Sequence, residues 1–474
     1  MRARGIVLAA AAGLSAALPA HSFDADPLSV RALAAPTARG ALESGEARAP
    51  CSFDDVAKTA LSLADVVDRA LCNNPQTRIA WANARVQAAQ VGVARSAWWP
   101  TLAASASASR NRQDGGTRIG GVPISGTTQY NQESAGLSAG YLLYDFGARD
   151  ATLANALQTL AAANFTHDAT VQKVFLAAVQ TYYQFFATRA AVDSAKEAEH
   201  SSLESLKAAT ARYETGAATP ADKYQAQTAN SQAVLNRIQA EGSAKSAEGV
   251  LANVIGLDAN RPVSLVPPKT AVPDRTFDSN LDQLIGAARG RRADLAAAEA
   301  QVKAAQASVD AARAAGLPTI SLSAGFNYSD TSLSSPFHSQ SLGIAVNIPI
   351  FTGFNTTYRV QAAQAQVESQ LAQRDSINLQ VALDVWQAYY TLTTNTQAVR
   401  SSADLVASAT QSERVASGRY KAGAGTILDL LTAQSALASA RLQNIQTIFN
   451  WTIAKAVLAQ AMGQLDFTAL EEKP

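Results

Sequence analysis

The sequence has few of the residues that build metal or redox centres. Its 474 residues include two cysteines, two methionines and four histidines. The histidines lack the spacing of metal ligands, the cysteines lack metal-site partners, and no Walker-type glycine loop is present. We therefore expect no metal, no cofactor and no catalytic set of residues, and we do not expect an enzyme.

Net charge and long hydrophobic runs are also scarce. The 39 Lys and Arg residues nearly balance the 38 Asp and Glu residues, so the chain lacks the basic surface that a nucleic-acid partner requires. After Ala20 no apolar run approaches the roughly 20 residues that a membrane helix needs. Any membrane-spanning part is therefore expected to consist of β-strands.

The N-terminus has the pattern of a chain that is exported. Arg2 and Arg4 precede a short apolar run that ends in small residues, which predicts a signal peptide over residues 1–20. A Pro- and Ala-rich leader is expected over residues 21–61. An even number of cysteines in an exported chain favours a disulfide between Cys51 and Cys72, although two separate buried thiols are the alternative.

The remainder of the chain contains an internal duplication. Trp99-Pro100-Thr101 is matched 218 residues later by Leu317-Pro318-Thr319, whereas motifs further on recur after 207 residues. The smaller offset predicts a longer loop in the first copy, rich in Gly and polar residues over residues 111–132. We expect the copies to cover residues 62–256 and 281–463, with an equatorial linker at 257–280 and a C-terminal tail at 464–474.

Each copy is predicted to contain a helix, two strands, a very long helix, a turn and another helix. Apolar and small polar residues alternate from Ile320 to Tyr328, from Leu342 to Ile350 and from Leu137 to Leu143, while Leu102 to Ser109 is mostly Ala and Ser. Each strand is close to the length that crosses a bilayer at a tilt. Four strands are too few to close a barrel in lipid, so we expect a barrel shared between subunits; two copies would supply eight strands and three would supply twelve.

The long helices are expected over residues 148–215 and 355–422. Each would extend for roughly 100 Å, which is too long for a globular core. An apolar stripe runs along both helices at three- and four-residue steps. It comprises Leu176, Val179 and Tyr183 in the first copy and Leu383, Trp386 and Tyr390 in the second.

The strongest repeated motif follows each long helix. A catalytic role is conceivable because the motif holds Arg, Tyr, Thr and Asp at fixed spacing, but a helical hairpin explains it better. The Gly can end one helix in the left-handed conformation, and the Thr and Asp can form a capping box for the next. The residues are Arg212, Tyr213, Gly216, Thr219 and Asp222 in the first copy and Arg419, Tyr420, Gly423, Thr426 and Asp429 in the second.

The two hairpin motifs, the Ala70 to Gln76 segment, the Trp-Trp-Pro-Thr and Gly-Leu-Pro-Thr junctions and the terminal Met462-Gly463 together resemble the TolC family of outer-membrane factors. The resemblance implies an α+β membrane protein in which four strands per chain contribute to a twelve-stranded β-barrel of a homotrimer. A long α-helical tunnel would continue the barrel into the periplasm. The hairpin turns would dock to a periplasmic adaptor, the membrane fusion protein, which works with an inner-membrane ABC exporter or drug pump.

The resemblance also bears on the gate and the cargo. Family members often close the periplasmic mouth with acidic side chains, and Glu413 is the nearest acid here, although it can equally be a solvated surface charge. No Cys directly follows the predicted signal peptide, and the chain resembles the type I secretion branch, which includes the exporter of adenylate-cyclase haemolysin. Multidrug or small-molecule efflux is the alternative, and a soluble periplasmic coiled-coil scaffold would use the same helices without the strands.

Overall fold

The computed structural model describes residues 26–36, 60–119, 122–268 and 280–465. The predicted signal peptide and Cys51 lie outside these residues, as do parts of the leader, of the linker and of the tail. Cys72 lies in the first described α-helix, α3 (Leu63–Asn73). Its pairing with Cys51 stays a prediction.

The described elements occur in the same order twice along the chain. A short 3-10 helix, η2 (Arg31–Leu33), precedes them. The first series is α3 (Leu63–Asn73), α4 (Pro75–Ser96), β1 (Thr101–Ile119), β2 (Val122–Tyr144), α5 (Ala148–Glu214) and α6 (Pro220–Val254). The second is α7 (Leu281–Arg291), α8 (Ala293–Ala314), β3 (Thr319–Thr331), β4 (Ser334–Asn347), α9 (Asn355–Lys421) and α10 (Ile427–Ala461).

The helices of the two series match in length. α5 and α9 have 67 residues each, and α6 and α10 have 35 each. No Pro interrupts α5 or α9, so the backbone hydrogen bonds run unbroken over roughly 100 Å. Each long helix begins at its predicted residue and ends one residue before the predicted end. Among the described helices, none is both long enough and apolar enough to cross a bilayer.

The chain divides into two compact units, and each draws on both series of elements. One, the sheet unit, contains Arg85–Ala161 and Ala300–Ala372 with the N-terminal residues up to Ala34. The other, the helical unit, contains Ala35–Ala84, Ala162–Glu299 and Gln373–Pro474.

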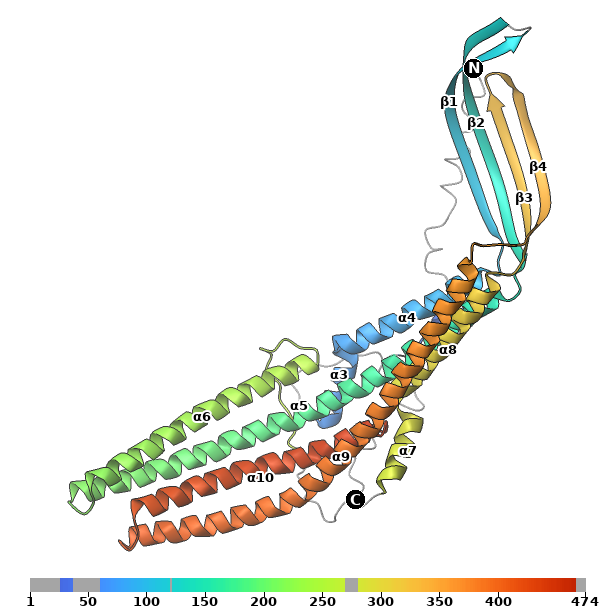
Figure 1. Cartoon of the computed structure of the whole chain (residues 1–474). Coiled ribbons are helices and arrows are strands. Elements are labelled where there is room, and N and C mark those ends of the chain that lie inside the picture. The colour runs from blue at the N-terminus through green and yellow to red at the C-terminus, as the bar shows by residue number, and fades with distance from the viewer. Residues whose placement is uncertain (1–25, 37–59, 120–121, 269–279, 466–474) are drawn as a thin grey trace. The chain divides into compact units, whose positions relative to one another are not determined.

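The sheet unit holds a four-stranded antiparallel sheet in the order β1-β2-β3-β4 (Figure 1). All four predicted strands are present, including the Ala- and Ser-rich β1. β4 ends at Asn347, three residues before the predicted end. Pro349 explains the early end, because it has no N–H to donate to a neighbouring strand.

The predicted loop over residues 111–132 is wrong. β1 and β2 continue as a paired hairpin, with Asn111 opposite Tyr130, up to Ile119 opposite Val122. Ladder pairing satisfies the backbone, and exposed polar side chains need no core, so a polar composition does not exclude strands here. β3 pairs with β2 only as far as Gln132, so the hairpin beyond that residue is two-stranded.

The helical unit has two main apolar cores. In the first, α3, α5 and the end of α6 enclose Val67, Phe175 and Leu251, and Ala456 of α10 joins them. In the second, α7, α9 and α10 enclose a comparable set of side chains. α10 therefore contributes to both cores, and this contact joins the two halves of the unit.

Candidate functional site: the two hairpin turns

The first turn joins α5 to α6 and ends α5 with paired backbone hydrogen bonds. Gly216 has φ +76°, a conformation that glycine adopts without the steric cost that a Cβ brings. Its N–H donates to the carbonyl oxygen of Tyr213 at 3.0 Å, and the N–H of Ala217 donates to that of Arg212 at 2.8 Å. This is a Schellman motif, and it satisfies carbonyl groups that the helix end would otherwise leave open.

The second turn joins α9 to α10 in the same way. Gly423 has φ +77°. Its N–H donates to the carbonyl oxygen of Tyr420 at 3.1 Å, and the N–H of Ala424 donates to that of Arg419 at 2.9 Å. The predicted hairpin conformation is thus confirmed at both turns, including the left-handed glycine.

A capping box starts the helix that follows each turn. The N–H of Asp222 donates to the Thr219 hydroxyl oxygen at 3.3 Å, and the N–H of Thr219 donates to the Asp222 carboxylate at 2.9 Å. In the second turn the corresponding distances between Thr426 and Asp429 are 3.2 and 3.3 Å. These Thr and Asp side chains are used in helix capping, as predicted.

The hydrogen bonds of the second capping box affect the protonation of Asp429. Hydrogen bonds from the side chain and then the backbone of Thr426 lower the pKa of the Asp429 carboxyl below its ordinary value of 3.8, and the charge of Arg419 acts in the same direction. The carboxylate is therefore the form that this turn favours.

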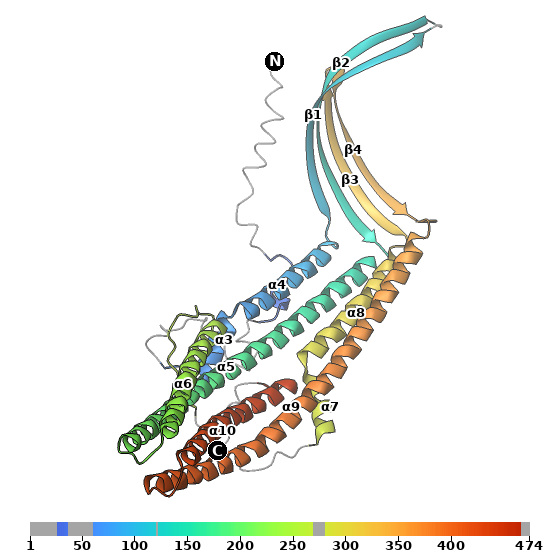
Figure 2. The same cartoon turned by 60° about the vertical axis from the view of Figure 1, so that its left-hand side comes forward.

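The two hairpins contact each other at their turn ends (Figure 2). Nη1 of Arg212 donates to the backbone carbonyl oxygen of Tyr420 at 2.8 Å, and the guanidinium carbon lies 4.9 Å from the centre of the Tyr420 ring. Beneath this contact, Ala209 and Ala226 of the first hairpin pack with Ile427 of the second. The first turn is thereby held to the second.

The duplicated arginine does not repeat this contact. Nη2 of Arg419 donates to the carbonyl oxygen of Ala424 in its own turn, at 3.3 Å and in an exposed position. Tyr213 is exposed, and Lys223 lies 5.3 Å from the centre of its ring. The two copies of the motif thus share a backbone conformation but differ in what their side chains contact.

A second polar contact between the hairpins could not be predicted from the sequence. Ser205 of α5 and Gln434 of α10 are joined by hydrogen bonds, with 3.0 Å between Nε2 of Gln434 and the Ser205 hydroxyl oxygen. A repeated Ala-Gln pair marks Gln434 in the sequence, but Ser205 has no comparable signal. The contact depends on which faces of the two hairpins meet.

Glu413 lies on α9, nearly two turns before Tyr420, and is partly buried. It has no ion-pair partner among the residues that the structure describes. Its charge is therefore not neutralised by an ion pair within the described part of this chain, and the gate role stays a prediction. The described residues also contain no group of His, Cys, Asp and Glu side chains arranged for a metal ion.

Comparison with known proteins gives a consistent family and fold. The sequence matches the family described as "Outer membrane efflux protein" over residues 66–257 and 284–464. It is 32% identical to "Protein CyaE" of Bordetella pertussis over 87% of this chain and 86% of that protein. It is 22% identical to "Outer membrane protein TolC" of Vibrio cholerae over 85% of this chain and 91% of that protein.

Solved structures share the fold. The CmeC outer membrane channel of Campylobacter jejuni superposes with a TM-score of 0.75, at 20% sequence identity, over 85% of this chain and 86% of that chain. The fold expected from the sequence, TolC-like with a four-stranded sheet and long helices, is thereby confirmed.

Proposed function

Because this chain belongs to the outer membrane efflux protein family, whose members are outer-membrane proteins, we propose that three copies form a passive channel from the periplasm to the outside. The sheet of each copy lies in the outer membrane and the long helices lie in the periplasm. The proposal rests on one observation above all, which is the chemical difference between the two faces of the sheet.

One face of the sheet is apolar. The register places Leu137 opposite Phe326 and Leu322 opposite Ile344, with Leu342 on the same face. Leu137, Phe326, Ile344 and Leu342 are all exposed in a single chain. An exposed apolar face of this extent calls for a partner, and in an outer-membrane strand that partner is lipid.

The opposite face carries small and polar residues. Ser138 lies opposite Gly325, and Ser323 lies opposite Gly343. Such a face suits a water-filled interior, because the small side chains leave room and the hydroxyl groups can bind water. The alternation therefore supports strands with one side toward lipid and the other toward an aqueous pore.

The sheet has two edges that no described strand of this chain pairs. β1 and β4 are the outer strands of the order β1-β2-β3-β4. Unpaired backbone groups cost several kcal/mol each in hydrocarbon, so each edge needs another strand. Three copies joined edge to edge supply twelve strands and leave no edge open.

The hairpin turns are proposed as the docking site for a periplasmic adaptor that works with an inner-membrane pump. Both turns expose short backbone segments on well-capped helices, which gives a rigid surface. Glu413 is proposed to contribute to a charged ring near the same end of the channel. Glu413→Gln should then lower the preference for cations in single-channel recordings, and an unchanged ion selectivity would exclude the gate role.

The proposed cargo is a protein that leaves by type I secretion. The sequence resembles that branch, and the identity of 32% to CyaE is higher than the 22% to TolC of Vibrio cholerae. Efflux of small molecules is the second candidate, favoured by the description of the matched family. The two candidate cargoes are distinguished by deleting the gene and then measuring both the secreted proteins and the sensitivity to drugs.

The channel is tested with purified full-length protein in detergent and in planar bilayers. Light scattering in detergent should give the mass of three chains, and the planar bilayers should show discrete conductance steps. Leu342→Arg, on the apolar face, should reduce assembly because Arg at the bilayer midplane costs about 2–4 kcal/mol. The neighbour Ser341→Arg, on the opposite face, is the matched control and should still assemble; a monomeric protein without conductance would reject the proposal.

A further inference from the structure

The charged residues of the sheet gather on one face. Ala104 lies opposite Leu137, which belongs to the apolar face, and β1 and β2 pair without a break. Side chains alternate between the two faces of a strand, and residues directly opposite each other share a face. Where the structure describes side chains of the sheet, all arginine and acidic residues fall on the apolar face by this rule: Arg110, Arg112, Asp114, Glu133 and Asp330.

These charges begin where the apolar part of that face ends. Tyr328 lies opposite His338, and the next row on the same face pairs Glu133 with Asp330. From Ile320 to Tyr328 the strand rises by about 27 Å, at about 3.4 Å for each residue. This height is comparable with the apolar band of about 25 Å on outer-membrane strands. In a bilayer the charges would therefore lie beyond the hydrocarbon, at the level of the lipid headgroups.

The direction of the strands decides which leaflet the charges meet. β1 begins at Thr101, shortly after α4, and its charged residues lie toward the turn with β2. At that end β1 and β2 run on past β3 and β4 (Figure 1). With the helices in the periplasm, this end faces outside the cell. The lipid at that level is the lipopolysaccharide of the outer leaflet, a glycolipid that carries phosphate groups.

The charges have few partners within the chain. Arg112 and Asp114 form an ion pair of 3.6 Å, with side chains that are 65% and 66% exposed, and such exposed pairs are weak. Arg110 is exposed and makes no ion pair among the residues that the structure describes. Glu133 and Asp330 carry like charges at directly opposite positions, which is unfavourable. The guanidinium groups of Arg110 and Arg112 are thus available to an external anion.

The two arginines suit phosphate groups in spacing and in height. They lie two residues apart on one face, so their Cα atoms are about 7 Å apart and their long side chains can reach one anion together. A guanidinium group binds a phosphate through two parallel N–H···O bonds. Arg110 lies four residues beyond the row of Tyr328, or about 10 Å along the membrane normal at a strand tilt of about 40°. The arginines would therefore reach the phosphates just outside the hydrocarbon.

The apolar face offers a place for the acyl chains of the same lipid. An open hollow of about 520 Å³ lies on it. Leu102, Leu137, Phe326 and Leu342 belong to its lining, and each of these side chains is exposed in a single chain. Acyl chains in the hollow would remove this apolar surface from water.

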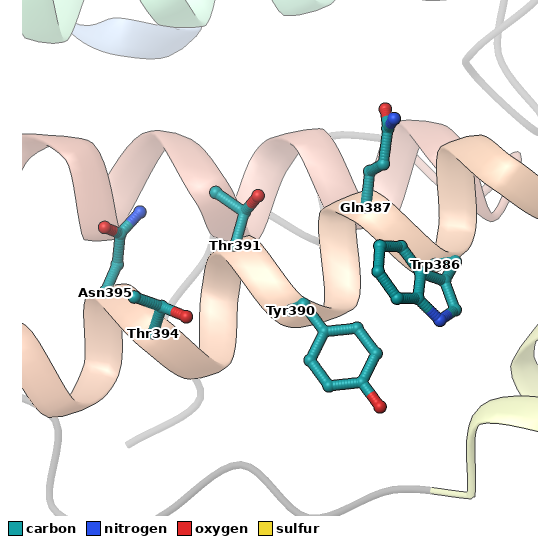
Figure 3. Close-up of a pocket in the computed structure, with 6 residues that line it drawn as sticks. All are labelled: Trp386, Gln387, Tyr390, Thr391, Thr394 and Asn395. Carbon is teal, nitrogen blue, oxygen red and sulfur yellow. The ribbon is translucent and has the colours of Figure 1, made fainter.

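Another exposed apolar surface lacks this combination. The rings of Trp386 and Tyr390 project from α9 beside an open cavity of about 430 Å³ (Figure 3). The described lining of that cavity consists of aromatic, amide and hydroxyl side chains without a charged group. A phosphate group finds no opposite charge there, whereas the sheet places arginines above an apolar hollow.

We propose that Arg110 and Arg112 bind the phosphate groups of lipopolysaccharide, while its acyl chains cover the hollow beside Phe326 and Leu342. The proposal rests on the channel and the orientation proposed above, and it adds a lipid-binding site on the outer surface of the barrel. Such a site holds the barrel at a fixed height in the membrane, because the arginines and the apolar band contact two different parts of one lipid.

A binding measurement tests the arginines. Full-length trimer in an uncharged detergent, with EDTA to remove divalent cations, is titrated with diphosphoryl lipid A, the phosphorylated lipid part of lipopolysaccharide. Arg110→Gln should weaken binding by about tenfold, because it removes a charged donor from the phosphate. Arg313→Gln is the matched control, since it removes the same charge from an exposed position on α8, and it should bind as the wild type does.

The neighbouring carboxylate gives a test of opposite sign. Glu133→Gln removes a negative charge about one row, or 7 Å, from Arg110 and should tighten the binding of diphosphoryl lipid A. Lipid A without phosphates should bind the wild type more weakly, and neither variant should change that binding. Inorganic phosphate at the same concentration should not displace diphosphoryl lipid A, because it lacks acyl chains.

A fluorescent label tests which face binds the lipid. Gln129 lies opposite Arg112, whereas Thr128 lies opposite Gln113 on the other face, and both positions are exposed. A polarity-sensitive dye on Gln129→Cys should respond to diphosphoryl lipid A, and the same dye on Thr128→Cys should not. Wild-type protein treated with the dye should show no response.

The outcomes separate this site from the channel itself. A conducting trimer in which Arg110→Gln binds diphosphoryl lipid A as tightly as the wild type would overturn the site and leave the channel intact. Equal binding of lipid A with and without phosphates, or an equal response at both dye positions, would also overturn it. A wild-type chain that is monomeric and makes no conductance would reject the channel and the lipid site together.

Discussion

Arg212 of the first hairpin donates a 2.8 Å hydrogen bond to the backbone carbonyl oxygen of Tyr420 in the second. The acceptor is a backbone atom, so substitution of Tyr420 alone leaves it in place. The contact joins segments that lie 208 residues apart in the sequence. It holds the turn ends of the two hairpins together.

Arg212→Ala should loosen the two turns from each other. The variant loses a hydrogen bond from a charged donor and a contact with an aromatic ring, which together contribute about 2–3 kcal/mol. Faster hydrogen exchange at the start of α10 is expected. Arg419→Ala is the matched control, because its hydrogen bond is longer, exposed and within its own turn; an equal effect in both variants would contradict the assigned role.

Gly423→Val should strain the second turn. A β-branched residue at φ +77° costs about 1–2 kcal/mol or more, because its Cβ crowds the backbone. Crosslinking to the adaptor and export should both decrease. Gly418→Val, inside α9 and with no atom within 4 Å of the added Cβ, lacks this strain; export by Gly423→Val at the wild-type level would refute the prediction.

Acid should weaken the second capping box. The pKa of Asp429 is lowered from its ordinary value of 3.8, so the carboxylate stabilises the folded turn above that pH, and the contribution is lost as the pH falls through the lowered pKa. Above pH 3.8, Asp429→Asn should be cut faster than wild type near residue 426 by an acid-active protease. The ratio of the two cleavage rates should approach one at lower pH. A ratio independent of pH would show that the Asp429 carboxylate does not stabilise the turn.

Arg292 should be more important for stability than a surface arginine. It is 8% exposed and lies within 3.0 Å of the carboxylates of Asp294 and Asp384. Arg292→Ala leaves these half-buried charges without their partner and should lower the free energy of unfolding by about 2–4 kcal/mol. The hydrogen bond from Arg292 lowers the pKa of Asp294 against the opposing effect of burial, so that pKa should rise in the variant.

Thermal unfolding of the detergent-solubilised protein measures the loss. Arg313→Ala is the control, since Arg313 and Asp310 form an ion pair at 3.2 Å with both side chains exposed. Such pairs contribute at most about 1 kcal/mol. Similar midpoints for the two variants would show that Arg292 has no special structural role.

Much of the fold could be predicted because local signals are strong. Pro and Gly are absent from almost all of α5 and α9, and the Gly, Thr and Asp of each turn motif fix the helix ends through caps that involve only neighbouring residues. Because the chain is internally duplicated, each element could be predicted twice, once from each copy. These features depend on the local chain, which a sequence displays directly.

The remaining features depend on contacts between distant segments. The Arg212 contact with Tyr420 could not be read from a motif that occurs identically in both copies, because only one copy makes it. The polar hairpin beyond Asn111 was mistaken for a loop, since strand pairing, rather than an apolar face, holds it together. In the same way, the stripes that contain Val179 and Trp386 are equivalent in sequence, but Val179 is 0% exposed and Trp386 is 49% exposed.

The two-stranded part of the β1 and β2 hairpin has an evolutionary consequence. No residue of β3 pairs with β2 between Val122 and Asn131, so equal numbers of residues can be lost from both arms without shifting the alignment of the rest of the sheet. Losses that differ by an odd number of residues between the arms would instead turn the side chains of one arm to the opposite face relative to the other arm. Natural variation in the length of this hairpin should therefore occur in matched pairs of residues, one from each arm.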